Sequence, residues 1–334
     1  YAYVKTRSDH NWHGIQSGWD IKRMLGTVPV EEDGSVIFKA PANTPISIQP
    51  LDKDGVAIQW MRSWVTGQPG EVVSCIGCHE DQNQIAIPKR VIASQKAPSA
   101  LTLPEGGTRS FTFDLEVQPI LDRACIACHN GEGKAFDLRG GKKDKLGYGT
   151  SYLNLHPYVH RQGGEGDMVV LQPYEYHPNT SELVRLLKKG HHNVKLTDKE
   201  WKTLYNWIDY NAPDKGYFNA NVLTDLPYKG FDQIKRRKEL TDKYANGAGV
   251  DWKKEIADYA DYLKKQGPIT PVMPEKAAPV KEKTLKVKGW PFGADRIKEM
   301  LAKEKETRKV VEIAPGVKVN FVRIPAGEFV MGSY

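Results

Sequence analysis

The chain has 334 residues, of which 40% are hydrophobic and 27% are charged. This composition is typical of a soluble globular protein, and no apolar run approaches the roughly 18 residues that a membrane-spanning helix needs. The formal net charge is +7, but part of the surplus lies in the lysine-rich stretch 276–288, and no basic patch interleaved with aromatic residues occurs on a recognisable nucleic-acid-binding module. We therefore predict neither a membrane span nor a nucleic-acid partner, and the length suggests two or three domains of roughly 100 to 200 residues each.

The first part of the chain is predicted to be rich in strands. Over residues 27–73, apolar and polar residues alternate in short runs, as in half-buried strands. The pairs Asp33-Gly34 and Asp54-Gly55 supply the residue types that tight hairpin turns favour. We expect residues 1–95 to form a small antiparallel β unit, followed by a connector at 96–110 that contains prolines and a Gly-Gly pair.

A mainly helical domain is predicted over residues 111–228. A short helix with one apolar side is expected at 115–123, and further helices are expected at 181–189 and 197–211. The last of these helices opens with Thr197-x-x-Glu200, the pattern of a capping box.

The rest of the chain is divided by glycines and prolines. Residues 229–266 have the period of a helical hairpin, and residues 267–307 have the composition of a linker. Strands are expected from residue 310, so residues 308–334 are predicted to be the beginning of a further domain. The predicted fold class is therefore α+β and multidomain, with a β unit, a mainly α-helical domain, a helical hairpin, a linker and the start of another domain.

All four cysteines lie in two Cys-x-x-Cys-His motifs. This pattern predicts two covalently attached c-type haems, because the two thiols bond to the porphyrin and the adjacent histidine binds the iron. A four-cysteine zinc site or two short disulfides would use the same cysteine pairs, but neither explains the histidine that follows each pair. The predicted attachment residues and proximal ligands are Cys75, Cys78, His79, Cys125, Cys128 and His129.

The second axial ligand of each haem is set by the fold, and it can be His, Met or absent. His191 and His192 lie in a loop between two predicted helices, and one of them, with a slight preference for His192, is expected to be the distal ligand of the second haem. For the first haem, His10 and His13 are candidates, and Met61 or an open site are the alternatives. Most of the remaining histidines are expected to be structural.

Two stretches resemble the haem-bearing region of the hydrazine synthase alpha subunit and related planctomycete-type multidomain cytochromes. One runs from Leu25-Gly26-Thr27-Val28-Pro29 through Met61-Arg62-Ser63 to the first haem motif, and the other joins the second motif to Lys189-Gly190-His191-His192 and Trp207-Ile208-Asp209-Tyr210. The resemblance covers roughly residues 20 to 240. It implies a haem-bearing cytochrome c domain, a catalytic first haem and a bis-histidine second haem, with His191 or His192 as the distal ligand.

One position departs from that family. The resemblance implies a tyrosine just after the first haem motif as a ligand of the catalytic haem, whereas this chain has Glu80-Asp81-Gln82-Asn83 there. The departure favours ordinary ligation by His79 over hydrazine chemistry.

A third stretch, Phe321-Val322-Arg323-Ile324-Pro325-Ala326-Gly327-Glu328-Phe329-Val330-Met331-Gly332-Ser333, resembles the opening strand of the formylglycine-generating enzyme fold, also called the sulfatase-modifying factor fold. In that family the catalytic residues come later in the chain.

The motifs predict a dihaem c-type cytochrome that transfers electrons between redox partner proteins or other cytochromes. Two alternatives remain open: a redox enzyme whose first haem acts on a small nitrogen or oxygen species, and a structural subunit of a homo-oligomer or haem-stacking filament. The attachment of haem to cysteines requires export, so a periplasmic or extracellular location is expected, with a signal peptide that was removed or lies upstream of Tyr1.

Overall fold

The computed structural model describes residues 14–15, 21–61, 63–76, 90–133, 135–145, 147–162, 171–216, 233–244, 251–275, 293–303 and 308–322. The chain divides into two compact units, residues 1–276 and residues 277–334. Each unit is treated by itself. Among the described residues, no helix is long and apolar enough to cross a membrane.

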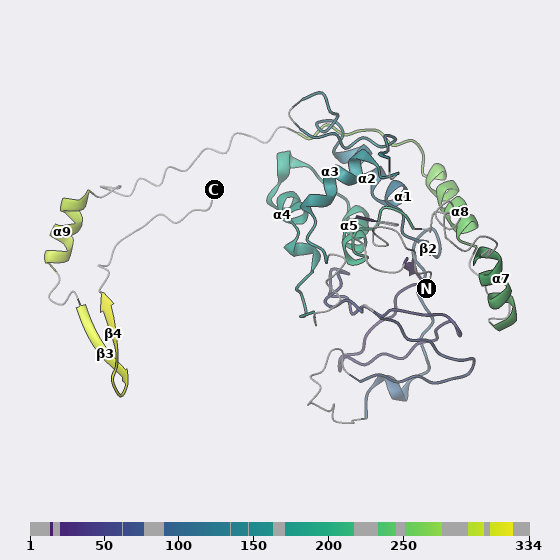
Figure 1. Ribbon diagram of the computed structural model, residues 1–334, viewed down its shortest axis with the longest axis horizontal. Coiled ribbons are helices and arrows are strands. Elements are labelled where there is room, and N and C mark those ends of the chain that lie inside the picture. The colour runs from purple at the N-terminus through teal and green to yellow at the C-terminus, as the bar shows by residue number, and fades with distance from the viewer. Residues whose placement is uncertain are drawn as a thin grey trace. The chain divides into compact units, whose positions relative to one another are not determined.

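The helices of the first unit are mostly short (Figure 1). They comprise α1 (Phe113–Glu116), α2 (Gln118–Ala124), α3 (Thr150–Leu155), α4 (Glu182–Lys189), α5 (Asp198–Asp209), α7 (Gln233–Tyr244) and α8 (Trp252–Lys265). The 3-10 turn η2 (Ala93–Gln95) precedes these helices, and the 3-10 turns η3 (His156–Tyr158), η5 (Pro178–Thr180) and η6 (His191–Asn193) lie between them.

The ends of α4 and α5 follow from their sequences. At the start of α5, the Thr197 side chain accepts a hydrogen bond from the Glu200 amide, and the Glu200 side chain accepts one from the Thr197 amide, so the predicted capping box is present. α4 ends at Gly190, whose φ of 97° is readily adopted only by glycine. These two boundaries fix the short loop that carries His191 and His192.

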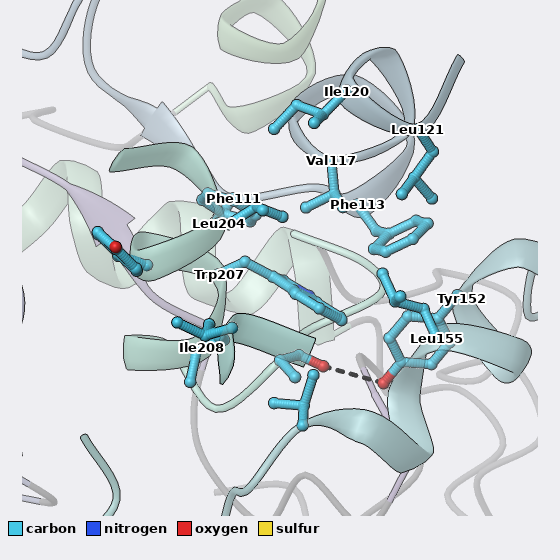
Figure 2. Close-up of a cluster of buried hydrophobic side chains, with 14 of the residues drawn as sticks. Phe111, Phe113, Val117, Ile120, Leu121, Tyr152, Leu155, Leu204, Trp207 and Ile208 are labelled. Carbon is cyan, nitrogen blue, oxygen red and sulfur yellow. Dashed lines mark hydrogen bonds between the residues drawn. The ribbon is translucent and has the colours of Figure 1, made fainter. Parts of the chain in front are cut away.

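The core of the first unit is built on aromatic side chains from α1, α3 and α5. Trp207 is fully buried, and its ring centroid lies 5.3 Å from that of Phe113, which in turn packs edge-on against Tyr152. Figure 2 shows Trp207 in the middle of this cluster, with the Tyr152 hydroxyl donating a hydrogen bond to the Ala212 carbonyl at 2.9 Å. The three helices are therefore held together by one shared core.

The strand-rich start of the chain is less regular than the sequence predicted. The turns at Asp33-Gly34 and Asp54-Gly55 form, with Gly34 N donating to Glu31 O and Gly55 N donating to Asp52 O. Within residues 27–73, however, the described pairings are isolated bridges such as Ile46 with Val65, rather than continuous ladders. Proline has no amide hydrogen to donate to a ladder, and this stretch contains Pro29, Pro41, Pro45 and Pro50.

Residues 96–110, which the sequence predicted to be a connector, pair with the first part of the chain. β2 (Arg109–Ser110) forms an antiparallel pair with β1 (Arg23–Met24), and Thr102 and Ser99 bridge to Thr27 and Phe38. Val56 belongs to the same buried cluster as the helical core. The expected boundary between a β unit and a helical domain therefore lies within one compact unit.

α8 packs against a buried ion pair of this unit through Tyr259. Arg109 donates to both carboxylate oxygens of Glu116, at 2.5 and 3.0 Å, and the Tyr259 hydroxyl donates to Glu116 at 2.9 Å. The Arg109 guanidinium also lies 3.5 Å from the centre of the Tyr259 ring. The second helix of the predicted hairpin thus packs on β2 and α1.

The second unit contains α9 (Ala294–Ala302) and an antiparallel hairpin of β3 (Arg308–Ala314) and β4 (Val317–Val322). Gly316, with a φ of 79°, forms the turn between the two strands. α9 lies within the range 267–307 that the sequence predicted to be a linker, and the hairpin lies in the expected strand region.

Candidate haem-binding site

The second Cys-x-x-Cys-His motif forms a tight turn that continues from α2. Cys125 N donates to Leu121 O at 2.8 Å, and His129 N donates to Cys125 O at 2.9 Å. The chain therefore enters the motif with helical geometry, and the motif closes on itself within five residues. This turn keeps the two thiols and the imidazole on one short, hydrogen-bonded segment.

The His129 ring is oriented by the chain that follows it. Its Nδ1 lies 3.1 Å from the Phe136 carbonyl oxygen, so Nδ1 carries the hydrogen and donates it. In that tautomer Nε2 has a free lone pair, which is the form in which histidine binds a metal. The Phe136 ring packs against the imidazole at a centroid distance of 4.8 Å, and Tyr158 stacks on Phe136 at 5.4 Å.

His191 faces His129. The two ring centroids lie 6.1 Å apart with an angle of 38° between the ring planes. Burial, together with the neighbouring rings of His192 and His129, lowers the pKa of His191, so its imidazole is neutral at neutral pH. His192, which the sequence slightly favoured, is exposed and stands edge-on to His191 at 4.6 Å.

The backbone explains why the two neighbouring histidines differ. Gly190 ends α4 in the left-handed region, and the chain then enters η6 at His191. His192 itself has a φ of 43°, which changes the direction of the chain between the two side chains. Two adjacent residues therefore cannot present their rings to the same place, and His191 takes the position toward His129.

The donor set fits a haem. Two metal–imidazole bonds of about 2 Å each, plus the distance from each nitrogen to its ring centre, separate the centroids of two axial histidines by about 6 Å. The observed 6.1 Å between His129 and His191 matches that separation. The two thiols of the motif and the aromatic rings of Phe136 and Tyr158 complete the kind of surroundings that a covalently attached haem needs.

Cys125 and Cys128 differ in exposure. Cys125 is half-buried, and burial raises the pKa of its thiol to about 12, whereas Cys128 is exposed. In the part of the chain that the structure describes, no group of three or more His, Cys, Asp or Glu side chains is arranged to hold a metal ion directly. The described residues include Cys75, Cys125 and Cys128, which are three of the four cysteines that the zinc alternative would use.

The first motif lies mostly outside the described residues. Cys75 is described and exposed, whereas Cys78, His79 and the candidate ligands His10 and His13 are not among the described residues. Met61, the alternative ligand, accepts a hydrogen bond on its sulfur from Ile48 N at 3.4 Å.

Three further histidines have structural partners, as the sequence predicted for most of them. His177 Nδ1 accepts from Asn179 N, so Nε2 carries the hydrogen toward Asp52 Oδ2 at 3.3 Å. His160 Nδ1 lies 2.7 Å from the Thr180 hydroxyl, and His156 Nε2 accepts from Arg161 at 2.6 Å.

Sequence reasoning missed the aromatic wall formed by Phe136 and Tyr158. Both residues lie in short or irregular segments, where no periodic pattern indicates which side chains turn inward.

A family model of the hydrazine synthase alpha subunit middle domain matches residues 1–80, a range that ends just after the first haem motif. No curated protein and no solved structure matches the chain. The match supports a relation between this part of the chain and that family. The match also suggests a role related to redox chemistry or nitrogen metabolism.

Proposed function

We propose that this chain is a dihaem c-type cytochrome that transfers electrons outside the cytoplasm. The observation that carries the proposal is the 6.1 Å separation of the His129 and His191 rings beside the turn that holds Cys125 and Cys128. When bound, each haem supplies an iron centre that gains and loses one electron, and the protein sets its position and potential.

The residues of the second site have separate tasks in this proposal. Cys125 and Cys128 would attach the porphyrin, and His129, whose Nδ1 is held by the Phe136 carbonyl, would bind the iron through Nε2. His191 would be the second histidine to hold the iron, so the protein would supply both of these ligands. A site without an open position favours electron transfer over binding of a substrate at the metal.

The surroundings suit rapid electron exchange. The half-buried rings of Phe136 and Tyr158 pack on the His129 side, and a ligand held in place lowers the reorganisation that each transfer requires. In this proposal the chain is an α+β multidomain protein whose partners are redox proteins or other cytochromes, and its location is periplasmic or extracellular because haem is attached to cysteines after export.

An enzymatic function at the first haem is the second candidate, because the hydrazine synthase family match extends through that motif. In this alternative the first iron keeps an open side for a small nitrogen or oxygen species, and the second haem relays electrons. Glu80-Asp81-Gln82-Asn83 follow the motif in place of the expected tyrosine, so ordinary ligation by His79 remains our preference.

The test begins with the holoprotein, whose covalent haem content is measured by mass and by pyridine haemochrome absorbance. Electron paramagnetic resonance of the oxidised form and absorbance spectra with carbon monoxide then count low-spin and high-spin haems. A paired Cys75→Ala and Cys78→Ala variant removes the first haem and isolates the signal of the second.

We expect two haems, with a low-spin second haem that does not bind carbon monoxide. A high-spin, carbon-monoxide-binding species that disappears in the paired variant supports the enzymatic candidate. A chain that matures without covalent haem, or a second haem that binds carbon monoxide, overturns the proposed function.

A further inference from the structure

Arg161 carries a positive charge that the described part of the chain does not neutralise. Its Nε donates to His156 Nε2 at 2.6 Å, one terminal nitrogen donates to the Gln162 carbonyl at 3.3 Å, and the other donates to the Ile15 carbonyl. All three acceptors are uncharged atoms. Burial lowers the pKa of Arg161, and no carboxylate contributes to the shift.

His156 does not supply the missing charge. Burial, followed by the adjacent Arg161 cation, lowers the pKa of His156 to about 4, so the imidazole is neutral and accepts the arginine's hydrogen bond. The nearby Tyr152 hydroxyl accepts from Ile15 N at 3.0 Å and donates to Ala212 O at 2.9 Å (Figure 2). Its hydrogen-bonding capacity is used by neutral backbone groups.

A guanidinium has five N–H donors, and the three acceptors occupy three of them. Two donors on the terminal nitrogens are left within the described structure. A half-buried cation without a counter-charge among the described residues is costly, and two adjacent guanidinium donors match the two oxygens of a carboxylate.

The position of Arg161 indicates which carboxylate. It follows η3 by three residues, and in η3 Tyr158 stacks on Phe136, whose ring and carbonyl both contact His129. Three residues of chain span at most about 11 Å, so the Arg161 backbone lies within that distance of Tyr158, a residue of the second haem site. A haem carries two propionate carboxylates at the edge of its ring.

We propose that Arg161, held in place by the neutral His156 and the Ile15 carbonyl, binds a propionate of the second haem. This inference rests on the proposed function, because it requires a haem between His129 and His191. The guanidinium would neutralise a propionate charge close to the iron and so raise the reduction potential of the second haem.

The test compares reduction potentials of the second haem in the holoprotein with the first haem removed by Cys75→Ala and Cys78→Ala. Arg161→Gln removes the cation, Arg161→Lys keeps the charge without the planar pair of donors, and Arg185→Gln is the control. Arg185 is exposed on α4, so its replacement removes the same charge from the surface.

We expect Arg161→Gln to shift the potential to a more negative value, because an unneutralised propionate stabilises the oxidised iron. The shift should persist better at high salt than any shift from Arg185→Gln, because Arg161 is half-buried whereas Arg185 is exposed. Equal shifts in the two variants, or a shift from Arg161→Gln that salt abolishes, would overturn the assignment.

Free small carboxylates are the other source of the same chemistry. In this case the reduction potential of the wild-type protein would change with sodium formate but not with an equal concentration of sodium chloride, and Arg161→Gln would abolish the change. That result would show an open anion site and overturn the propionate assignment. If Arg161→Gln does not incorporate haem, redox difference infrared spectra of Arg161→Lys replace the measurement of its potential. A shifted haem carboxylate band supports the contact, and an unchanged band contradicts it.

The wild-type spectra separate the two proposals. Two covalent haems with a low-spin second haem leave the proposed function intact even if Arg161→Gln has no effect, in which case only the propionate contact fails.

Discussion

The imidazole rings of His129 and His191 face each other at 6.1 Å although they come from different elements. His129 closes the turn after α2, and its ring is held by the Phe136 carbonyl. His191 opens η6, directly after the left-handed Gly190 that ends α4. Two local backbone features, a haem-motif turn and a glycine cap, therefore create one paired site.

The pairing predicts different effects for the two adjacent histidines. His191→Ala should convert the second haem from low-spin to high-spin and let it bind carbon monoxide, because the distal side loses its ligand. His192→Ala should leave the spectrum unchanged, because this exposed ring only stands beside His191. Absorbance and electron paramagnetic resonance of the variants, each without the first haem, provide the measurement. The reverse pattern would reassign the distal ligand to His192.

Gly190 is predicted to matter for both stability and ligation. A side chain at φ 97° costs about 1 to 2 kcal/mol, and beyond the adjacent residues no atom lies within 4 Å of the place that a Cβ would take, so the cost of Gly190→Ala is purely conformational. We expect the free energy of unfolding to fall by about that amount and the carbon monoxide-binding fraction of the second haem to rise. Gly133→Ala, in the loop after His129, is the control. It also meets open space but has no positive φ, so its effect should stay below about 0.5 kcal/mol. Equal effects of the two changes would contradict the role given to Gly190.

The features that the sequence predicted well are those with local causes. The capping box of Thr197 and Glu200 and the glycine end of α4 depend on a few adjacent residues, so both can be read from a short window. The two Cys-x-x-Cys-His motifs are equally local, but their assignment to haem stays a prediction.

The features that the sequence did not predict depend on contacts between distant segments. The placement of the His191 ring beside His129 depends on the backbone of η6, where His192 has a positive φ, and the stack of Tyr158 on Phe136 depends on how the residues after His129 meet η3. The same limit applies to residues 96–110, which look like a polar connector because short bridges with residues 23–38 leave no periodic pattern.

The ion pair of Arg109 and Glu116 should be among the most sensitive buried contacts of the first unit. Glu116→Ala leaves the buried guanidinium unpaired and removes the acceptor of the Tyr259 hydroxyl, so we expect a loss of about 3 to 5 kcal/mol in urea unfolding. Asp258→Ala is the control on α8, because its pair with Lys254 is exposed, and its loss should be below about 1 kcal/mol. Losses of similar size would show that the buried pair does not anchor α8.

Asp209 predicts a dependence of stability on pH. Its carboxylate is buried at the end of α5, where it accepts hydrogen bonds from Ala57 N at 2.9 Å and from Trp60 Nε1 at 3.5 Å. Burial raises the pKa of Asp209 to about 7 from an ordinary value of 3.8. The folded protein therefore binds this proton more tightly than the unfolded chain. The resulting stability is full below about pH 4 and is lost as the pH rises to about 7.

Asparagine cannot ionise, so Asp209→Asn should remove the part of the pH dependence of the free energy of unfolding that Asp209 contributes. At about 1.4 kcal/mol per pKa unit, that part is on the order of 4 kcal/mol between pH 4 and pH 8. Urea unfolding at both pH values provides the measurement. Asp214, whose pKa burial also raises to about 7, should retain its own part of the slope until it too is replaced by Asn. A slope that Asp209→Asn leaves unchanged would mean that the folded protein keeps this carboxylate ionised, and the burial of Asp209 would then need a compensating cation.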